Sequence, residues 1–258
     1  MDSLTFVREL EVFKNERLAP IVGAGRISLE DGGPGDGKKM LQIALANEIS
    51  VSELAARWMP STPEIDVKLA LAKQAGDEAS HFRLVADRLS ALGFDVAGFQ
   101  GPGESPLFAY LTGLSSTVER IAAGLFTLES IAYGVNENFM AFCTREGDSE
   151  TVRIYREYIQ PDEQAHQQLG QRLLEKYATT ADLQQAARRT VDRVLEIAAA
   201  SRAQAARRVG SACLRETFVY QLLKRYDRWH RNQPLFLQGR PRGRGTTGRG
   251  IVIRTYDH

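Results

Sequence analysis

The sequence is poor in cysteine and carries no strong excess of charge. Only two cysteines, Cys143 and Cys213, occur among its 258 residues, and they form no Cys-x-x-Cys pair. We therefore expect neither a zinc ribbon, nor a rubredoxin-like iron site, nor a disulfide scaffold. The net charge of +1 produces no overall field that would attract nucleic acid or a membrane surface.

Long apolar runs are also missing. No run approaches the roughly 18 residues of a membrane span, and the first residues are too charged for a signal peptide. We therefore expect a cytoplasmic protein with no part in the membrane. Apolar residues make up 43% of the chain and charged residues 25%, which is ordinary for a globular protein of this length.

Helical periodicity dominates what is present, and convincing β-hairpin patterns are absent. Pro63 before one segment and Gly93 after it are typical of a helix start and end. Pro161 lies inside another segment, where we expect a kink. The predicted helices cover residues 39–59, 64–92, 107–144, 149–177, 181–209 and 211–230. The fold class is therefore all-α.

The helices suggest a division of the chain into parts. Residues 1–38 read as an N-terminal extension that ends in a loop over 22–38. We expect a four-helix bundle over 39–177, followed by additional helices over 178–232 that pack on the bundle. Residues 233–258 include the run GRPRGRGTTGRG, which alternates Arg and Gly and is typical of a flexible basic tail or of a segment that contacts RNA or another anionic partner.

Two Glu-x-x-His motifs carry the candidate chemistry. Glu78 and His81 form the first, and Glu163 and His166 form the second. Residues at positions i and i+3 share one face of a helix, so each motif directs a carboxylate and an imidazole to one point. One such motif by itself is more often a solvated surface pair. Two motifs on neighbouring helices instead match the pattern of a dimetal site inside a bundle.

A bundle dimetal site needs one more glutamate from each of the two other helices. Measured from the turn at Ser61 and Thr62, Glu48 and Glu78 differ in distance by three residues, about 4.5 Å of helix rise. Measured from the turn at Gly147 and Asp148, Glu129 and Glu163 also differ by three residues. Glu53 and Glu137 match less well. Glu48 and Glu129 therefore complete the predicted set of ligands.

The predicted ligands interrupt stripes that are otherwise mostly apolar. Ala44 and Val51 flank Glu48, for example, and Leu125 and Ala132 flank Glu129 at helical spacing. Buried carboxylates that lie together repel each other and take up protons unless cations neutralise them. The pattern therefore predicts two divalent metal ions, bound by Glu48, Glu78, His81, Glu129, Glu163 and His166.

The order Glu, Glu-x-x-His, Glu, Glu-x-x-His resembles the ferritin-like superfamily over roughly residues 39–177. The segment from Asp77 to Phe82 is similar in style to a metal-binding helix of bacterial ferritin-like hydroxylases. The resemblance implies that Glu78 and Glu163 bridge the metals and that Glu48 and Glu129 are terminal ligands. It also implies two iron ions, with manganese as the alternative, and O2 as co-substrate.

The first functional hypothesis is an O2-dependent di-iron oxygenase or oxidase. The resemblance covers tRNA-modifying hydroxylases and aldehyde-deformylating oxygenases, and the Arg-Gly tail favours the former, so the substrate is a small molecule or is carried on RNA. It also implies a ferredoxin or a flavin reductase as electron donor. Tyr133 lies one turn from Glu129 and is the candidate catalytic residue, as a relay of electrons or protons.

Three other hypotheses remain open from the sequence. Iron storage or detoxification uses similar ligands, although the residues after the fourth helix fit a storage shell poorly. A manganese catalase would turn over peroxide without a reductant. A non-enzymatic helical interaction protein would leave the site without metal. We also expect that the chain forms a homodimer.

Overall fold

The computed structural model describes residues 1–30, 37–99 and 105–210, and this part of the chain contains helices and no strands. The all-α prediction is therefore confirmed. The α-helices are α1 (Ser3–Glu30), α2 (Gly37–Trp58), α3 (Ile65–Ala91), α4 (Pro106–Thr112), α5 (Thr117–Ile121), α6 (Glu129–Arg145), α7 (Ser149–Ile154), α8 (Gln160–Tyr177) and α9 (Ala181–Gly210). Three shorter elements are the 3-10 helix η1 (Val96–Gly98) and the π-helices η2 (Ala122–Leu128) and η3 (Tyr155–Ile159).

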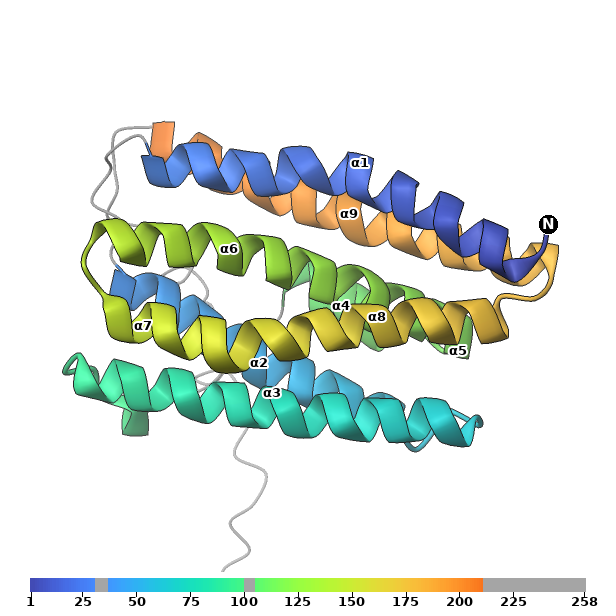
Figure 1. Ribbon diagram of the computed structural model, residues 1–258, viewed down its shortest axis with the longest axis horizontal. Coiled ribbons are helices and arrows are strands. Elements are labelled where there is room, and N and C mark those ends of the chain that lie inside the picture. The colour runs from blue at the N-terminus through green and yellow to red at the C-terminus, as the bar shows by residue number, and fades with distance from the viewer. Residues whose placement is uncertain (31–36, 100–104, 211–258) are drawn as a thin grey trace, which may run out of the picture.

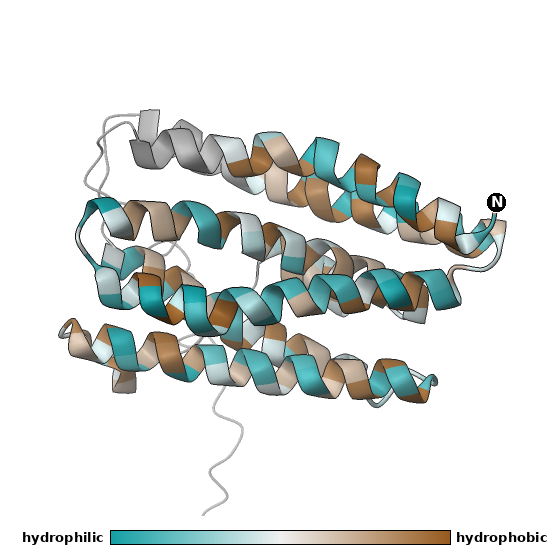
Figure 2. Ribbon diagram, viewed as in Figure 1, coloured by the Kyte–Doolittle hydropathy of each residue, from teal (hydrophilic) through white to brown (hydrophobic). Residues whose placement is uncertain are grey.

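The helices form three layers of roughly antiparallel pairs (Figure 1). Helices α1 and α9 make one outer layer, α6 and α8 make the middle layer, and α2 and α3 make the other outer layer. The predicted bundle consists of α2, α3, the continuous helix α5–η2–α6 and the continuous helix α7–η3–α8. Figure 2 shows polar and apolar residues interspersed along each helix, as expected of amphipathic helices that bury one face.

Two apolar clusters occupy the two ends of the bundle. One cluster, which includes Trp58 and Leu71, lies where α2 ends and α3 begins, and it extends to α1 and α9. The other, which includes Leu45, Leu89 and Phe139, lies where α2 begins and α3 ends. The predicted metal ligands fall between these two clusters in sequence on all four helices, so apolar packing closes the middle of the bundle on both sides.

The middle layer is packed closely. A Cβ atom on Gly170 of α8 would lie 2.8 Å from the backbone of Leu125 and Phe126 in η2. Such a contact is too short for a methyl group, so only glycine lets the two backbones approach this closely. Gly170 therefore sets the spacing between the two helices that carry Glu129 and Glu163.

The N-terminal region differs from its prediction. Helix α1 continues to Glu30 and α2 begins at Gly37, so the described part of the loop expected over 22–38 is helical, and residues 31–36 lie outside the described part of the chain. The apolar residues Val7, Leu10 and Leu18 of α1 are buried in the first cluster. An amphipathic helix that packs on the bundle therefore replaces much of the expected extension. The predicted helix over 211–230 and the tail over 233–258 also lie outside the described residues.

The predicted third helix is broken near its start. Helix α4 ends at Thr112 with Gly113 as its C-cap, and α5 begins after Ser116, so residues 107–144 are not one continuous helix. Gly113 and the two serines that follow are residues typical of helix ends and starts. The buried guanidinium of Arg120 donates to the carbonyl of Leu114 (3.0 Å) and so satisfies a backbone group in the break.

The kink expected at Pro161 takes the form of a π-helix. The π-helix η3 ends at Ile159, and Pro161 lies in the first turn of α8. Proline donates no backbone hydrogen bond, so a wider turn before it accommodates the missing donor. Within residues 1–30, 37–99 and 105–210, no helix combines the length and hydropathy that a membrane span requires.

Candidate metal centre

The structure brings all six predicted ligands together in the middle of the bundle. Each of the four bundle helices contributes at least one of them, and none is more than 7% exposed. The contributors are Glu48 from α2, Glu78 and His81 from α3, Glu129 from α6, and Glu163 and His166 from α8.

The six side chains form two overlapping groups of potential ligands. In each group, one donor atom per residue lies within 4.8 Å of the others. Glu78 and Glu163 belong to both groups. The first group is Glu48, Glu78, His81 and Glu163, and the second is Glu78, Glu129, Glu163 and His166. Two neighbouring positions that share two carboxylates are the arrangement of a carboxylate-bridged dimetal site.

Each histidine turns one ring nitrogen toward the carboxylates. Nδ1 of His81 lies 3.5 Å from Glu48 Oε2 and 3.5 Å from Glu78 Oε2. Nδ1 of His166 lies 3.6 Å from Glu78 Oε1 and 3.8 Å from Glu129 Oε2. Neither Nδ1 atom has a hydrogen-bond partner although both are buried. Both nitrogens are therefore placed as ligand atoms rather than as members of a protein hydrogen bond.

The other nitrogen of each histidine contacts an aspartate from the opposite motif. Nε2 of His166 donates to Asp77 Oδ2 (2.8 Å), and Nε2 of His81 lies 3.3 Å from Asp162 Oδ2. Lys73 forms ion pairs with both aspartates, at 3.9 Å in the case of Asp162. An aspartate in this position fixes the tautomer and the orientation of a ligating imidazole.

Neither aspartate was among the site residues predicted from the sequence. The signal was present, since both motifs read Asp-Glu-x-x-His, in residues 77–81 and 162–166. An aspartate next to a buried glutamate projects toward the neighbouring helix rather than toward its own motif. Its partner is therefore the histidine of the other motif, which only the packing of α3 against α8 reveals.

Gln74 is a third residue at the cluster that was not predicted from the sequence. It lies one turn before Glu78 on α3, is buried, and its amide donates to Glu129 Oε1. The backbone carbonyl of Glu129 accepts a further hydrogen bond from Gln167 (3.3 Å). Both contacts hold the first residue of α6 against the neighbouring helices.

Two π-helices precede the ligands of the middle layer. The π-helix η2 ends one residue before Glu129, and η3 ends four residues before Glu163. Inside η2, the hydroxyl of Thr127 donates to the carbonyl of Ala122 (2.7 Å), five residues earlier. A π segment inside an α-helix is frequently found at a functional site because it re-aims the residues around it.

The carboxyl groups of the cluster are electrostatically strained. Burial raises the pKa of Glu78 well above its usual value, and the nearby charge of Glu129 raises it further. Burial and the charge of Glu129 also raise the pKa of Glu163. Burial acts in the same direction on Glu129, but hydrogen bonds from its neighbours outweigh it and lower the pKa of Glu129. Without cations, the shared pair Glu78 and Glu163 therefore retains protons to higher pH than exposed glutamates do.

The histidines respond in the complementary direction. Burial lowers the pKa of His81, but the contacts with Glu48 and Glu78 outweigh this effect and raise it to about 11. Contacts with Glu129 and Asp77 raise the pKa of His166 in the same way. Protons therefore neutralise this acidic cluster when no cation does so.

The donor set fits divalent metal ions. Oε1 of Glu78 and Oε2 of Glu163 are buried without a hydrogen-bond partner, as are the two Nδ1 atoms. Unpartnered buried polar atoms are costly, so four of them that point to one place require an explanation. Carboxylate oxygens with imidazole nitrogens are suitable ligands for iron and manganese.

A cavity of about 360 Å³ opens onto the cluster. Glu48, Glu78, Glu129 and Glu163 form its inner end. Its walls are mostly apolar and come from α2, α4, α6 and η3. The remaining lining residues are Met40, Ile43, Ala44, Asn47, Val51, Leu107, Phe108, Leu128, Ile131, Ala132, Val135, Asn136, Phe139 and Tyr155.

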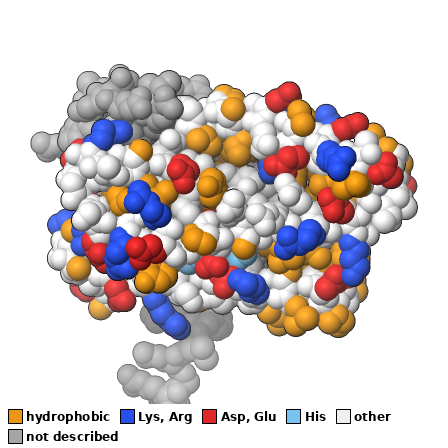
Figure 3. Space-filling model, in the orientation of Figure 1, with side chains coloured by type: hydrophobic (Ala, Val, Ile, Leu, Met, Phe, Trp, Pro, Cys, Tyr) orange, Lys and Arg blue, Asp and Glu red, His pale blue; other side chains and the backbone are white. Residues whose placement is uncertain are grey.

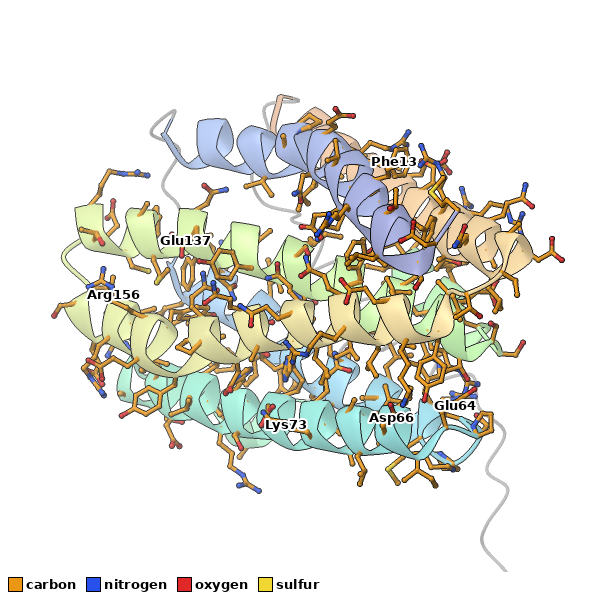
Figure 4. All side chains as sticks on the ribbon, turned by 45° about the vertical axis from the view of Figure 1, so that its right-hand side comes forward. Phe13, Glu64, Asp66, Lys73, Glu137 and Arg156 are labelled. Atoms are coloured by element: carbon orange, nitrogen blue, oxygen red, sulfur yellow. The ribbon has the colours of Figure 1, made fainter. Side chains whose placement is uncertain are left out.

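Tyr155, rather than Tyr133, lies at this cavity. Tyr133 lines a separate hollow of about 480 Å³ between α6 and the start of α8. Glu137 and Arg156 lie at that hollow (Figure 4). Burial raises the pKa of Tyr155 well above its usual value, and the charge of Glu48 adds to this effect, so Tyr155 remains a phenol O–H donor. A catalytic role for Tyr133 at the cluster is therefore not supported by its position.

On the face shown in Figure 3, the outer surface has no large patch of charges of one sign. Basic, acidic and apolar side chains are interspersed over that face. Among the described residues, both groups of side chains that are close enough to hold a metal ion belong to the buried cluster, which places the candidate chemistry inside the bundle.

Comparisons with known proteins bear on the fold alone. The chain matches no family model and no curated protein sequence. It is similar in structure to a domain of unknown function with a heme oxygenase-like fold from Shewanella denitrificans OS217, with a TM-score of 0.57 and 13% sequence identity. The similarity covers 84% of this chain and 99% of that one. The chain therefore has a helical fold like that of the heme oxygenase-like domain.

Proposed function

We propose that the buried cluster binds two divalent metal ions and that the protein is an O2-dependent oxidase or oxygenase of an organic molecule. One ion would be held by Glu48 and His81, the other by Glu129 and His166, and both by Glu78 and Glu163. The observation that carries the proposal is the pair of overlapping ligand groups that share two buried carboxylates.

Iron is the metal that this proposal favours, with manganese as the alternative. Carboxylate and imidazole ligands suit both metals, and a pair of reduced iron ions supplies the electrons that activate O2. In a monooxygenation, one oxygen atom enters the substrate and the other leaves as water, with two electrons and two protons supplied from outside. We propose a ferredoxin or a flavin reductase as the source of these electrons.

The residues of this chain would position the metals and control access to them. Asp77 and Asp162 hold the two imidazoles with Nδ1 directed inward. The apolar clusters at the two ends of the bundle exclude bulk water from the carboxylates. Exclusion of water strengthens electrostatic interactions in the site and protects reactive species from side reactions.

The order of the ligands in the sequence supports the more specific proposal of a ferritin-like dimetal protein. The heme oxygenase-like neighbour supports only the helical fold. Iron storage and peroxide removal use small inorganic substrates. The cavity of about 360 Å³ that ends at the four glutamates is mostly apolar instead, which favours an organic substrate.

Iron analysis of the full-length chain tests the proposal. After anaerobic loading with ferrous iron, we expect two irons per chain and, on exposure to O2, the near-ultraviolet absorption of an oxo-bridged ferric pair. Glu163→Ala removes a carboxylate from both ligand groups and should abolish the absorption, while Glu157→Ala, a change in η3 outside the cluster, should retain it.

Three outcomes would contradict the proposal. A chain that stays free of iron after loading would remove the dimetal site altogether. Unchanged iron content in Glu163→Ala, with helicity preserved in both variants, would show that the ligands have been misassigned. Rapid disproportionation of peroxide by the manganese-loaded chain, without any reductant, would identify a catalase instead.

A further inference from the structure

The cavity beside the cluster contains polar atoms that the protein itself does not use. The hydroxyl of Tyr155 has no hydrogen-bond partner, and the side chain of Tyr155 is only 1% exposed. The amide Nδ2 of Asn136 is also buried without a partner. Both residues line the cavity. Buried donors without partners are rare in folded proteins, so two of them in one apolar cavity point to a ligand that accepts hydrogen bonds.

The two donors belong to the same region of the cavity wall. Asn136 lies two turns after Glu129 on α6, and Tyr155 lies about two turns before Glu163, at the start of η3. Because α6 and α7 are antiparallel, both residues lie on the same side of the cluster. Phe139, one turn beyond Asn136, contacts the Tyr155 ring edge-on at 5.2 Å between centroids, which confirms that these positions are neighbours.

Charge limits what this cavity can accept. Its lining residues, all from the described part of the chain, include four glutamates and no lysine, arginine or histidine. An anionic ligand would find no cationic side chain in the wall to compensate for the loss of its hydration, and the charge of the two proposed divalent ions would be balanced by the four glutamates. The hydroxyl and amide donors together suit a neutral oxygen atom, such as that of a ketone, an ester or an ether.

Volume limits the size of the ligand. If each non-hydrogen atom takes roughly the 30 Å³ of a water molecule in the liquid, the cavity of about 360 Å³ holds about a dozen such atoms. Met40 and Ile43 of α2 and Phe108 of α4 also line the cavity, and Ile43 is 41% exposed, so it marks the mouth. A ligand of this size would reach from the mouth to the glutamates.

We infer that the cavity binds a neutral, mostly apolar organic molecule of about a dozen non-hydrogen atoms, whose single accepting oxygen receives hydrogen bonds from Tyr155 and Asn136. This inference names the substrate class of the proposed oxidase. It rests on the proposed function only where it calls the bound molecule a substrate. The binding itself depends on the cavity and not on O2 chemistry.

Three probes of similar shape separate the contributions. Butyrophenone carries a neutral accepting oxygen, butylbenzene carries none, and 4-phenylbutyrate carries a charged carboxylate. Isothermal titration of the full-length chain, loaded with ferrous iron and kept free of O2, measures the affinity for each. We expect butyrophenone to bind about tenfold more tightly than butylbenzene, as one or two hydrogen bonds provide, and 4-phenylbutyrate to bind more weakly than the ketone.

Matched variants assign the effect to the cavity. Asn136→Leu and Tyr155→Phe each remove a donor and little volume, so they should reduce the preference for the ketone and leave the affinity for butylbenzene nearly unchanged. Ile43→Trp should block the mouth and weaken all three probes. Ile65→Trp, at a position on α3 that is 67% exposed, is the control for a surface tryptophan and should change none of them.

The outcomes distinguish this inference from the proposed function. Equal affinity for ketone and alkylbenzene, tighter binding of the carboxylate, or a ketone preference that survives both donor variants would overturn it. The same titrations on metal-free chain separate the two proposals. A ketone preference in a chain that takes up no iron would support the ligand-binding cavity and contradict the proposed oxidase. Two bound irons without binding of any probe would support the dimetal site and contradict the ligand-binding cavity.

Discussion

The two halves of the metal cluster have similar ligands but unequal support. On one side, Glu129 accepts a hydrogen bond from Gln74 and is tied through its carbonyl to Gln167. On the other side, Glu48 is 7% exposed, the highest value among the six ligands. The difference indicates one half that is held rigidly and one half that has more freedom to move when a molecule binds.

The support on the Glu129 side reaches the outer layer of the molecule. Lys14 of α1 is 1% exposed and donates to Ser130 Oγ (2.8 Å). Ser130 in turn donates to the carbonyl of Phe126 in η2 (2.8 Å). The ammonium group also lies 4.1 Å from the centroid of the Phe126 ring. Helix α1 therefore stabilises the π-helix next to Glu129.

Removal of the terminal glutamate from one half or the other should reveal the largest difference between the two halves, in the amount of metal that the chain retains. We expect Glu48→Ala to retain about one metal per chain in the Glu129 half, because its ligands and their hydrogen bonds remain. Glu129→Ala should retain less metal at the same free concentration. Metal analysis after equilibrium dialysis measures both, and Glu53→Ala, an exposed position on α2, is the control. Equal retention in both variants would contradict the asymmetry.

The two aspartates behind the histidines should show a smaller difference. Asp77 lies 2.8 Å from His166 and is 21% exposed, whereas Asp162 lies 3.3 Å from His81 and is 40% exposed. Loss of such a partner typically lowers metal affinity by roughly 10- to 100-fold. We expect Asp77→Asn to approach the upper value and Asp162→Asn the lower, in competition titrations with a metal chelator. A larger loss in Asp162→Asn would reverse the assignment of the rigid half.

The pH dependence of stability should differ between metal-free and metal-loaded chain. The pKa values of Glu78 and Glu163 are raised, and that of His81 is raised to about 11. The folded state therefore binds more protons than the unfolded state, and the stability of the metal-free chain falls as pH rises. Metal displaces these protons, so the gain in Tm upon binding of zinc should grow between about pH 6 and 8. A gain independent of pH would show that the cluster binds metal without proton release.

Lys14 should give the smallest effect. Lys14→Met keeps most of the side-chain volume but removes the hydrogen bond to Ser130, so we expect a loss of about 1 kcal/mol in the free energy of unfolding. Chemical denaturation of the metal-free chain measures it, with Arg172→Met at an exposed position of α8 as control. A loss as small as that of the control would show that α1 does not support the η2 segment.

The position of the ligands could be predicted from the sequence because it depends on local geometry. The spacing i, i+3 and the distances from two short turns determine which side chains share a face and a height. Glu48 and Glu129, inferred only from height, lie in the cluster beside the paired motifs. Chain reversal in a tight turn leaves few alternatives for the register of two neighbouring helices.

The choice of tyrosine could not be predicted, because it depends on which side of a helix meets which neighbour. At about 100° per residue, Tyr133 lies about 40° to one side of Glu129, and Ala132 lies about 60° to the other. The structure places the apolar cavity on the side of Ala132 and the separate hollow on the side of Tyr133. Periodicity placed Ala132 in the apolar stripe and Tyr133 one turn from Glu129, but it could not show which of these two sides faces the cavity.

The sequence by itself determined the all-helical class, the motifs and the level at which the ligands meet, since these follow from periodicity within each helix. Only the tertiary structure decided that Asp77 and Asp162 each contact the histidine of the other motif. It also decided the π-helices η2 and η3 and the packing of α1 against the bundle. These features arise from contacts between segments far apart in the chain, and hydrophobic periodicity specifies that a face is buried without specifying its partner.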